Sequence, residues 1–311
     1  MKKIIWLVVM FVGGFNHLYS QENPLITQQW YSRINHNPAS VGNNDAWDIF
    51  MVHRNQWVGF KNAPKTTMLN VHTSINEFSS GIGLSIAYDM EGPARTSIIG
   101  KVLYSYRINI TEESQLSFGL GVDVINRANN PNKHTVVTEP DPEKGFEKEA
   151  RTSLGIDFGL EFTTERFALG ASVTNLGRKF ERLTTFINGT QYYAYGFYRF
   201  PVSDAVDLSP TGTYVYGNNE HLLEFGATAF FNDNVWGGVV YRIDNAICFL
   251  AGFKFDIFRV GYSYDYHTND ARKFGSTHEI ALSIRITKPK HGLIRNKDGS
   301  YSAYNRIYRC W

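Results

Sequence analysis

Apolar and polar residues alternate along most of this chain with a period of two. In the segment SGIGLSIAYD, Ile82, Leu84 and Ile86 fall on one face of an extended strand, and Ser85 and Ala87 fall on the other. The same alternation recurs in QLSFGLGVDV, SLGIDFGLEF, FRVGYSYDYH and HEIALSIRI. Alternation over about nine to ten residues is typical of a strand that crosses the hydrocarbon core of a membrane. The pattern therefore predicts membrane-spanning strands.

Fourteen segments carry this pattern, and bacterial barrels have an even number of strands. We therefore predict an all-β fold, a transmembrane antiparallel β-barrel of about 14 strands and of the outer-membrane type. The strands are expected at residues 47–57, 66–74, 80–89, 96–109, 115–126, 151–163, 166–174, 190–199, 206–217, 221–231, 234–243, 246–256, 258–267 and 276–287.

The connections between these strands differ in length in an ordered way. The even-numbered ones are short, and most odd-numbered ones are longer, including the third, DMEGPAR, and the fifth, residues 127–150; the ninth and eleventh are short exceptions. Short turns at one end and long loops at the other are expected when both termini are periplasmic.

The second face of the strands decides between a membrane barrel and a soluble β-sandwich. A sandwich turns Lys, Glu and Thr toward bulk water, whereas here small residues are mixed with charges of both signs. Such a face suits a crowded, wet lumen, with the aliphatic and aromatic face toward lipid. The charged residues are Lys101, Arg107, Asp123, Asp157, Glu161, Glu224, Arg242, Lys254, Arg259, Asp265, Glu279 and Arg285.

The start of the chain has the features of an export signal. Lys2 and Lys3 precede a mostly apolar stretch at residues 4–15, and Ser20 is a small residue at the expected cleavage point. The apolar stretch is short for a membrane-spanning helix, which argues against the alternative of an uncleaved anchor. We predict that residues 1–20 are a signal peptide.

Charge and cysteine content exclude further classes of protein. Removing residues 1–20 takes two lysines from the 31 Lys+Arg and leaves 29, against 29 Asp+Glu. A nucleic-acid-binding protein is expected to carry a basic excess on one face, so no nucleic acid is predicted as a partner. Cys248 and Cys310 are the two cysteines, and two lone thiols are favoured over one bridge.

No motif of catalysis, cofactor binding or metal binding stands out in the sequence. We therefore expect a protein that is not an enzyme, with no cofactor and no metal. Asp157 and Glu161 share the lumen face four positions apart, and we expect each to pair with arginines on adjacent strands. An outer-membrane phospholipase is a weaker alternative, because it would need a Ser/His pair at one end of the barrel.

The region that precedes and includes the first strands carries an ordered set of short motifs. Asn37-Pro38-Ala39 is followed by Gly42, then by Arg54-Asn55-Gln56-Trp57, and then by Ala63-Pro64. In this order the motifs resemble the PorP/SprF family of Bacteroidota outer-membrane proteins, which are associated with type IX secretion and gliding motility. The resemblance covers residues 21–287 and is strongest before residue 126. It implies that the motif residues are candidates for partner contacts: Asn37, Pro38, Ala39, Gly42, Arg54, Gln56, Trp57, Ala63 and Pro64.

The resemblance also implies a function. A family member would be a barrel of the secretion and gliding machinery that receives or anchors an exported, adhesin-like surface protein. Its partners would be outer-membrane lipid, a cargo protein with a C-terminal secretion domain, and periplasmic components of the machinery. The alternative is a channel for apolar solutes, similar to the long-chain fatty-acid transporters, which also have fourteen strands and an N-terminal plug.

The sequence divides into four parts on this reading. Residues 1–20 are the signal peptide, 21–46 a periplasmic lid or plug held by Asn37 and Pro38, 47–287 the barrel, and 288–311 a basic periplasmic tail. A lumen of fourteen strands is wider than side chains alone need fill, which leaves room for a plug. An ordinary lead-in peptide is an equally good reading of residues 21–46.

Overall fold

The computed structural model describes residues 26–44, 46–111, 113–130, 149–178, 189–218, 220–288, 293–295 and 301–303. The predicted signal peptide and Cys310 lie outside these ranges, and Cys248 is a free, buried thiol. None of the helices in the described ranges is long and apolar enough to cross a membrane.

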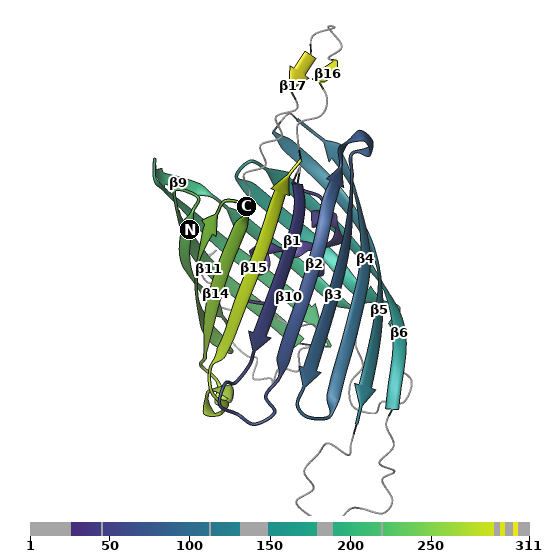
Figure 1. Ribbon diagram of the computed structural model, residues 1–311, viewed down its shortest axis with the longest axis vertical. Helices are drawn as coiled ribbons and strands as arrows, with labels where there is room; N and C mark the ends of the chain where they lie inside the picture. The colour runs from purple at the N-terminus through teal and green to yellow at the C-terminus, as the bar shows by residue number, and fades with distance from the viewer. Residues whose placement is uncertain are drawn as a thin grey trace, which may run out of the picture.

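One antiparallel sheet closes on itself to form a barrel (Figure 1). Each strand pairs with its neighbour in sequence, and the barrel closes where β1 pairs with β15. The four-residue β9 continues the line of β8 along β10, so the wall has the fourteen strands that the sequence predicts. The strands of the wall are β1 (Ala46–Asn55), β2 (Lys65–Ile75), β3 (Ser80–Glu91), β4 (Arg95–Asn109), β5 (Ser114–Asn129), β6 (Glu149–Thr164), β7 (Phe167–Leu176), β8 (Gln191–Tyr198), β9 (Phe200–Ser203), β10 (Val206–Gly217), β11 (Glu220–Phe231), β12 (Val235–Arg242), β13 (Ala246–Phe255), β14 (Phe258–His267) and β15 (Thr277–Thr287).

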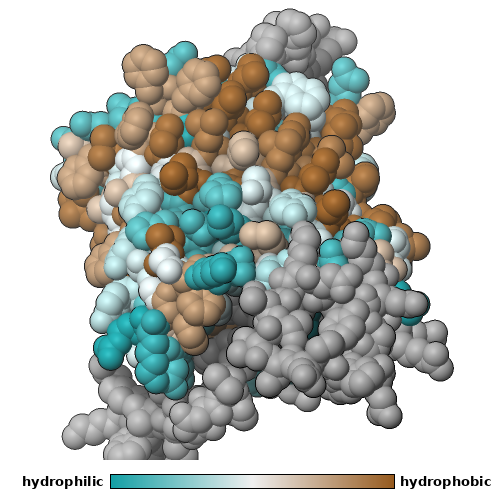
Figure 2. Space-filling view, turned by 60° about the horizontal axis from the view of Figure 1, so that its bottom comes forward, coloured by the Kyte–Doolittle hydropathy of each residue, from teal (hydrophilic) through white to brown (hydrophobic). Residues whose placement is uncertain are grey.

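The predicted faces of the strands are confirmed. Phe118 of β5 is 42% exposed on the outer face, whereas Gly119 next to it is buried in the lumen. Ile82, Leu84 and Ile86 of β3 are likewise exposed on the outside. Figure 2 shows apolar side chains gathered over the wall and polar ones toward the end that faces the viewer. This outer belt matches the apolar band that a barrel presents to lipid.

The two ends of the barrel differ as expected. The longest connections join β5 to β6 and β7 to β8, and the strand ends that they join lie at the end where β1 finishes, at the bottom of Figure 1. At the other end, turns of two to four residues such as 165–166 and 76–79 join the strands. The short hairpin of β16 (Leu293–Arg295) and β17 (Tyr301–Ala303) follows β15 at this end.

The prediction that the third connection is a longer loop is wrong. The pairing of β3 with β4 continues to Glu91 opposite Arg95, so only residues 92–94 join the two strands. Gly92 adopts a φ of +72°, a left-handed conformation that glycine tolerates and that a tight turn needs. The charged, proline-containing sequence suggested a loop, but the cross-strand pairing extends into it.

Residues 26–44 lie inside the barrel rather than in front of it. They form three single-turn 3-10 helices, η1 (Gln29–Tyr31), η2 (Arg33–Asn35) and η3 (Pro38–Ser40). Their side chains are mostly buried, among them Ile34 at 1% and Asn37 at 0% exposure. We call residues 26–44 the plug.

Candidate functional site

The first part of the plug is tied to carboxylates of the closing strands. The backbone N–H groups of Thr27 and Gln28 donate to the two carboxylate oxygens of Glu279 on β15, at 2.9 and 3.0 Å. The Thr27 hydroxyl donates to Asp265 of β14 at 2.9 Å. Arg54 of β1 lies between the two acids, 2.7 Å from Asp265 and 3.3 Å from Glu279. This cluster is buried, and Arg242 adds a second cation 3.6 Å from Asp265.

The middle of the plug is held by Glu161 of β6. The Arg33 guanidinium forms a two-pronged ion pair with this carboxylate, with Nε to Oε2 at 2.9 Å and Nη2 to Oε1 at 3.2 Å. Asn43 and Tyr195 also donate to Glu161. Two-pronged pairing of this kind adds geometric specificity to the charge attraction. A single wall carboxylate therefore fixes both the middle and the end of the plug.

Asn37 fixes the turn that begins η3. Its side-chain oxygen accepts from the Ala39 N–H at 2.9 Å, which caps the helix, and Pro38 occupies the first helical position. Its amide nitrogen donates to the Leu160 carbonyl and to the Tyr195 hydroxyl, both at 2.9 Å. The Asn-Pro-Ala motif therefore forms a local turn and also anchors the plug on β6 and β8.

The last part of the plug docks on β2 to β4. The Ser105 hydroxyl donates to the Val41 carbonyl at 2.6 Å, and Arg107 donates to the Gly42 carbonyl. The Gly42 N–H donates to His72 Nδ1 at 3.1 Å. Gly42 has a φ of +68°, and a Cβ there would lie 2.8 Å from the Cα of Gly81, so both conformation and space require glycine.

Four lumen-facing glycines make room for the plug. A Cβ added to Gly119 would overlap the backbone of Ala39, and one added to Gly159 would overlap the Asn37 side chain. The remaining two positions follow the same rule: Gly81 lies against the Val41 carbonyl, and Gly261 lies against the Gln28 side chain. The wall is therefore shaped to the backbone and side chains of residues 26–44.

Aromatic side chains fill the space between the plug and β1, β11 and β12. Trp30 meets Phe230 and Trp236 edge to face, each at 5.6 Å between ring centroids. Tyr31 stacks on Phe50 at 5.7 Å. Edge-to-face and offset arrangements are those that aromatic pairs prefer. The plug thus adds apolar packing to its polar anchors.

His36 lies in the plug with its ring stacked on Tyr193 of β8, 5.3 Å between centroids. Burial, assisted by the positive charges of Lys101 and Arg33, lowers the pKa of His36 to about 3. The imidazole is therefore uncharged at neutral pH.

The predicted partners of Asp157 and Glu161 are wrong. Glu161 pairs with Arg33 of the plug, and Asp157 pairs at 2.7 Å with Lys101 of β4, which lies two strands away. The folded segment inside the barrel supplies the partner of Glu161, and the partner of Asp157 is a lysine that reaches it from two strands along the wall.

The motif residues from the sequence divide between two places. Asn37, Pro38, Ala39 and Gly42 belong to the plug, and Arg54 reaches it from β1. The others lie in the loop from β1 to β2, at the end where the long connections lie: Gln56, Trp57, Ala63 and Pro64.

The loop half of the motif is a folded turn with an exposed aromatic surface. The Gln56 N–H donates to the Pro64 carbonyl at 3.0 Å, and Ala63 is buried. Trp57 contacts Phe274 of the neighbouring loop, 5.4 Å between ring centroids. Phe60, 50% exposed, meets the same ring at 5.1 Å. The two halves of the motif therefore cannot form one contact site.

Sequence reasoning missed several residues that hold the plug, chiefly Thr27, Arg33 and Asn43. It also took the inward glycines only as small residues of the lumen face, although their recurrence there was a usable signal of a close backbone. Within the ranges that the structure describes, no group of three or more His, Cys, Asp or Glu side chains is placed to hold a metal ion.

Comparison with known proteins gives a family and a fold. The sequence model of the family described as "Type IX secretion system membrane protein PorP/SprF" matches residues 18–284. No curated protein matches the sequence.

Solved structures with a similar fold are outer-membrane proteins. The CymD monoaromatic hydrocarbon channel aligns with a TM-score of 0.50 and 12% identity, over 86% of this chain and 94% of that chain. Omp33 of Acinetobacter baumannii aligns with a TM-score of 0.47 and 7% identity, over 78% and 99%. A Pseudomonas aeruginosa FadL homologue aligns at 0.43 and 12%, over 78% and 89%. Identities this low establish the barrel fold alone.

Proposed function

Since the chain belongs to the PorP/SprF family of type IX secretion system membrane proteins, we propose that it receives or anchors an exported, adhesin-like protein at the cell surface. The observation that carries this proposal is the way in which the plug is held inside the barrel. A segment that is fixed by a buried ion pair and by glycines shaped to its backbone occupies the lumen, which suits a platform better than an open pore.

The two ends of the barrel indicate how the platform is oriented across the membrane. With both termini periplasmic, the long connections and the loop that carries Gln56 and Trp57 face outward, as the asymmetry of loop lengths suggests. The hairpin of β16 and β17 then faces the periplasm, where it is available to components of the machinery. In this orientation the outer loops contact a cargo protein with a C-terminal secretion domain.

In this proposal the two halves of the family motif have separate tasks. The enclosed half, from Asn37 to Gly42 together with Arg54, holds the plug and does not touch a partner while the plug is seated. The loop half, Gln56 and Trp57, presents a surface beside the exposed ring of Phe60 to the partner. No catalytic step is part of this role.

The alternative function is a channel for apolar solutes. It would need a path through the lumen, where the plug is bound to β15, β6 and β4. We expect the anchors on Glu279, Glu161 and Arg107 to obstruct such a path. The occupied lumen favours the platform.

Deletion of the gene tests the proposal. We expect the strain to lose surface display of one large exported protein while general secretion continues, and wild-type protein should restore display. Pull-down of the detergent-solubilised barrel with mass spectrometry should recover that cargo or components of the secretion machinery. Normal display in the deletion strain, with no protein partner in the pull-down, would contradict the proposal.

A variant pair in one loop tests the partner surface. Trp57→Ala should reduce display, because it removes the ring that supports the surface beside Phe274. Lys61→Ala, an exposed residue of the same loop, is the matched control and should display normally. Equal behaviour of the two variants would place the contact elsewhere.

A further inference from the structure

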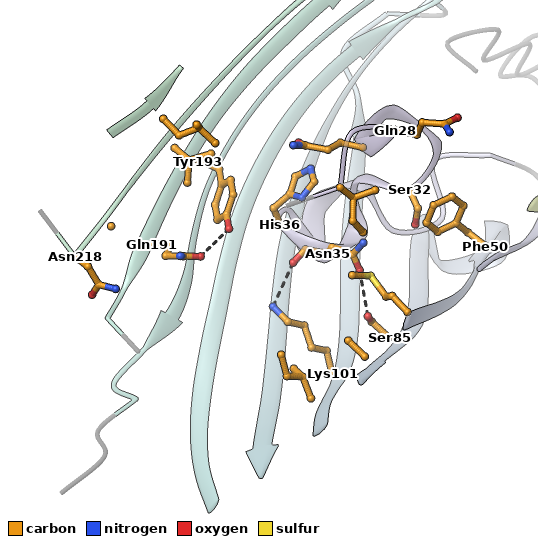
Figure 3. A pocket seen from close by; sticks show the side chains of 18 of the residues that line it. Gln28, Ser32, Asn35, His36, Phe50, Ser85, Lys101, Gln191, Tyr193 and Asn218 are labelled. Carbon is orange, nitrogen blue, oxygen red and sulfur yellow. Dashed lines mark hydrogen bonds between the residues drawn. The ribbon is translucent and has the colours of Figure 1, made fainter. Parts of the chain in front are cut away.

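The plug fills the lumen unevenly. Toward the end with the long connections it packs closely against the wall, where the Ser85 hydroxyl donates to the Asn35 side chain at 3.1 Å and Lys101 donates to the Asn35 carbonyl at 3.3 Å (Figure 3). The cavity left there is only about 80 Å³. At the opposite end a cavity of about 620 Å³ remains, within the range of roughly 300–1,000 Å³ that is common for ligand pockets. Room for a further segment therefore exists at the end with the short turns.

Three neighbouring turns form the walls of this larger cavity. They join β6 to β7, β9 to β10 and β11 to β12. Phe230 lines its inner side, and Trp30 of the plug meets this ring edge to face. The Arg199 guanidinium lies 4.6 Å from the centroid of the same ring. The cavity therefore borders the aromatic contact that holds the plug.

The lining of the cavity is acidic. Arg199 pairs with Asp207 at 2.7 Å and also with Asp233. Among the residues that the structure describes, the side chains of Asp204 and Glu165 have no hydrogen-bond or ion-pair partner. Four acids and two arginines give the lining a net charge of −2. These residues are Glu165, Arg166, Arg199, Asp204, Asp207 and Asp233.

The tail, residues 288–311, starts at the same end of the barrel and is basic. It follows β15 there, and it contains six Lys and Arg residues against one Asp. Residues 304–311, YNRIYRCW, include Arg306 and Arg309 and no acid. Opposite charges on two surfaces favour their association and its specificity. The tail is therefore a chemically suitable occupant of the acidic cavity.

The tail is also long enough to reach the cavity. At about 4.8 Å between strands and a tilt of about 40°, a barrel of fourteen strands is about 28 Å across. The hairpin pairs Leu293 with Ala303, so residues 293–303 add little to the reach. The five steps from Lys288 to Leu293 and the six from Ala303 to Arg309 together span at most about 36 Å. This span exceeds the width of the barrel.

From the size of the cavity, its charge and the reach of the tail, we infer that residues 304–311 bind in this cavity, with Arg306 and Arg309 directed toward Asp204 and Glu165. A tethered segment has an advantage over a free basic peptide, because a short flexible tether raises its effective concentration to the millimolar range. In this position the tail covers the lumen opening beside Phe230. The inference does not depend on the proposed role in surface display.

A disulfide bridge between the cavity and the tail tests the inference. Cys310 belongs to the proposed segment, whereas Cys248 is buried. Ser203→Cys places a thiol in the cavity wall. Ile110→Cys is the control, because this exposed position lies in the turn after β4, at the same end of the barrel but outside the cavity.

The two variants are compared in the purified full-length barrel in detergent. The protein is oxidised at low concentration, and linked peptides are quantified by mass spectrometry. The thiol of Ser203→Cys should bridge to Cys310 about tenfold faster than that of Ile110→Cys, because binding raises its effective concentration near the tail. Adding Cys310→Ser should abolish the bridge. Heat-modifiable gel migration checks folding, and Ala205→Cys, in the same cavity wall, replaces Ser203→Cys if the latter does not fold.

Charge variants in the Ser203→Cys protein test the proposed contacts. Arg306→Glu with Arg309→Glu should slow the bridge about tenfold, since the attraction becomes repulsion, and high salt should also slow it. Lys297→Glu reverses a charge elsewhere in the tail and should have a much smaller effect. Adding Asp204→Arg to the double reversal should restore most of the rate.

Three results would overturn the inference. One is an equal bridging rate from the cavity wall and from the control turn. Another is a rate from the cavity wall that the double charge reversal does not change. The third is slow bridging in the purified barrel combined with protection of the Ser203→Cys thiol from alkylation in whole cells, which would assign the cavity to a partner protein.

Discussion

Arg33 of the plug and Glu161 of β6 form an ion pair through two hydrogen bonds in the lumen, although 128 positions separate them in the sequence. Glu161 is fully buried and also accepts from Asn43 and Tyr195. Removal of Arg33 would leave a buried carboxylate without a cationic partner, and such a loss is far more costly than the loss of an exposed pair.

Arg33→Ala should therefore loosen the plug by about 3 kcal/mol, and adding Glu161→Gln should recover part of this cost because it removes the unpaired charge. Hydrogen exchange of the amides of residues 30–41 measures the effect directly. Lys273→Ala, which breaks an exposed pair with Asp270, is the control and should change exchange little. Equal protection in Arg33→Ala and the wild type would mean that the pair does not hold the plug.

The glycine at position 119 should be essential for the plug but not for the barrel. Gly119→Val directs a branched side chain at the backbone of Ala39, so we expect the plug to leave its seat and to be cut by added protease. Gly100→Val on β4 is the control, because a Cβ there meets no atom within 4 Å. Intact plugs in both variants would contradict the fit described for Gly119.

The strand pattern of the sequence predicted the fold closely, since the period of two directly reports which side chains face lipid. Phe118 and Gly119 fall on the faces that the alternation assigned to them. The alternation does not reveal, however, that Ala39 lies against Gly119, which constrains the lumen position as well.

The site itself could be predicted only in part. Asn37 and Pro38 were recognised through a motif, whereas the pairing of Arg33 with Glu161 was not, because it depends on how residues 26–44 cross the lumen. No local pattern encodes a contact between a 3-10 helix and a strand far along the chain.

The lipid-facing position Phe118 should not tolerate a charge. Phe118→Arg is expected to cost roughly 2–4 kcal/mol if the residue lies near the bilayer midplane, falling to about 0–1 kcal/mol near an interface. Ile108→Arg, next to the turn that ends β4, is the matched position near an interface. Folding of each variant into liposomes under urea titration gives the two free energies. A larger cost at Ile108 than at Phe118 would contradict this placement of the membrane.

Acid should weaken the binding of the plug inside the barrel, because His36 takes up a proton when the plug is released. Its pKa is lowered to about 3 in the folded protein, whereas a released histidine has a pKa of about 6.5, so release takes up a proton in this window. The stability due to neutral His36 is complete above about pH 6.5 and is lost as the pH falls toward about 3, by about 1.4 kcal/mol per pH unit. The groups that face the ring are Lys101 and Arg33, whose charges disfavour the imidazolium, Tyr193, on which it stacks, and Tyr195, which meets it edge to face. We expect the plug amides to exchange faster at about pH 4.5 than at about pH 7.5, after correction for intrinsic exchange.

His36→Gln should flatten this dependence, since glutamine cannot titrate, and Asp270→Asn in an exposed loop should leave it unchanged. An equally steep dependence in His36→Gln would assign the acid response to the lumen carboxylates instead.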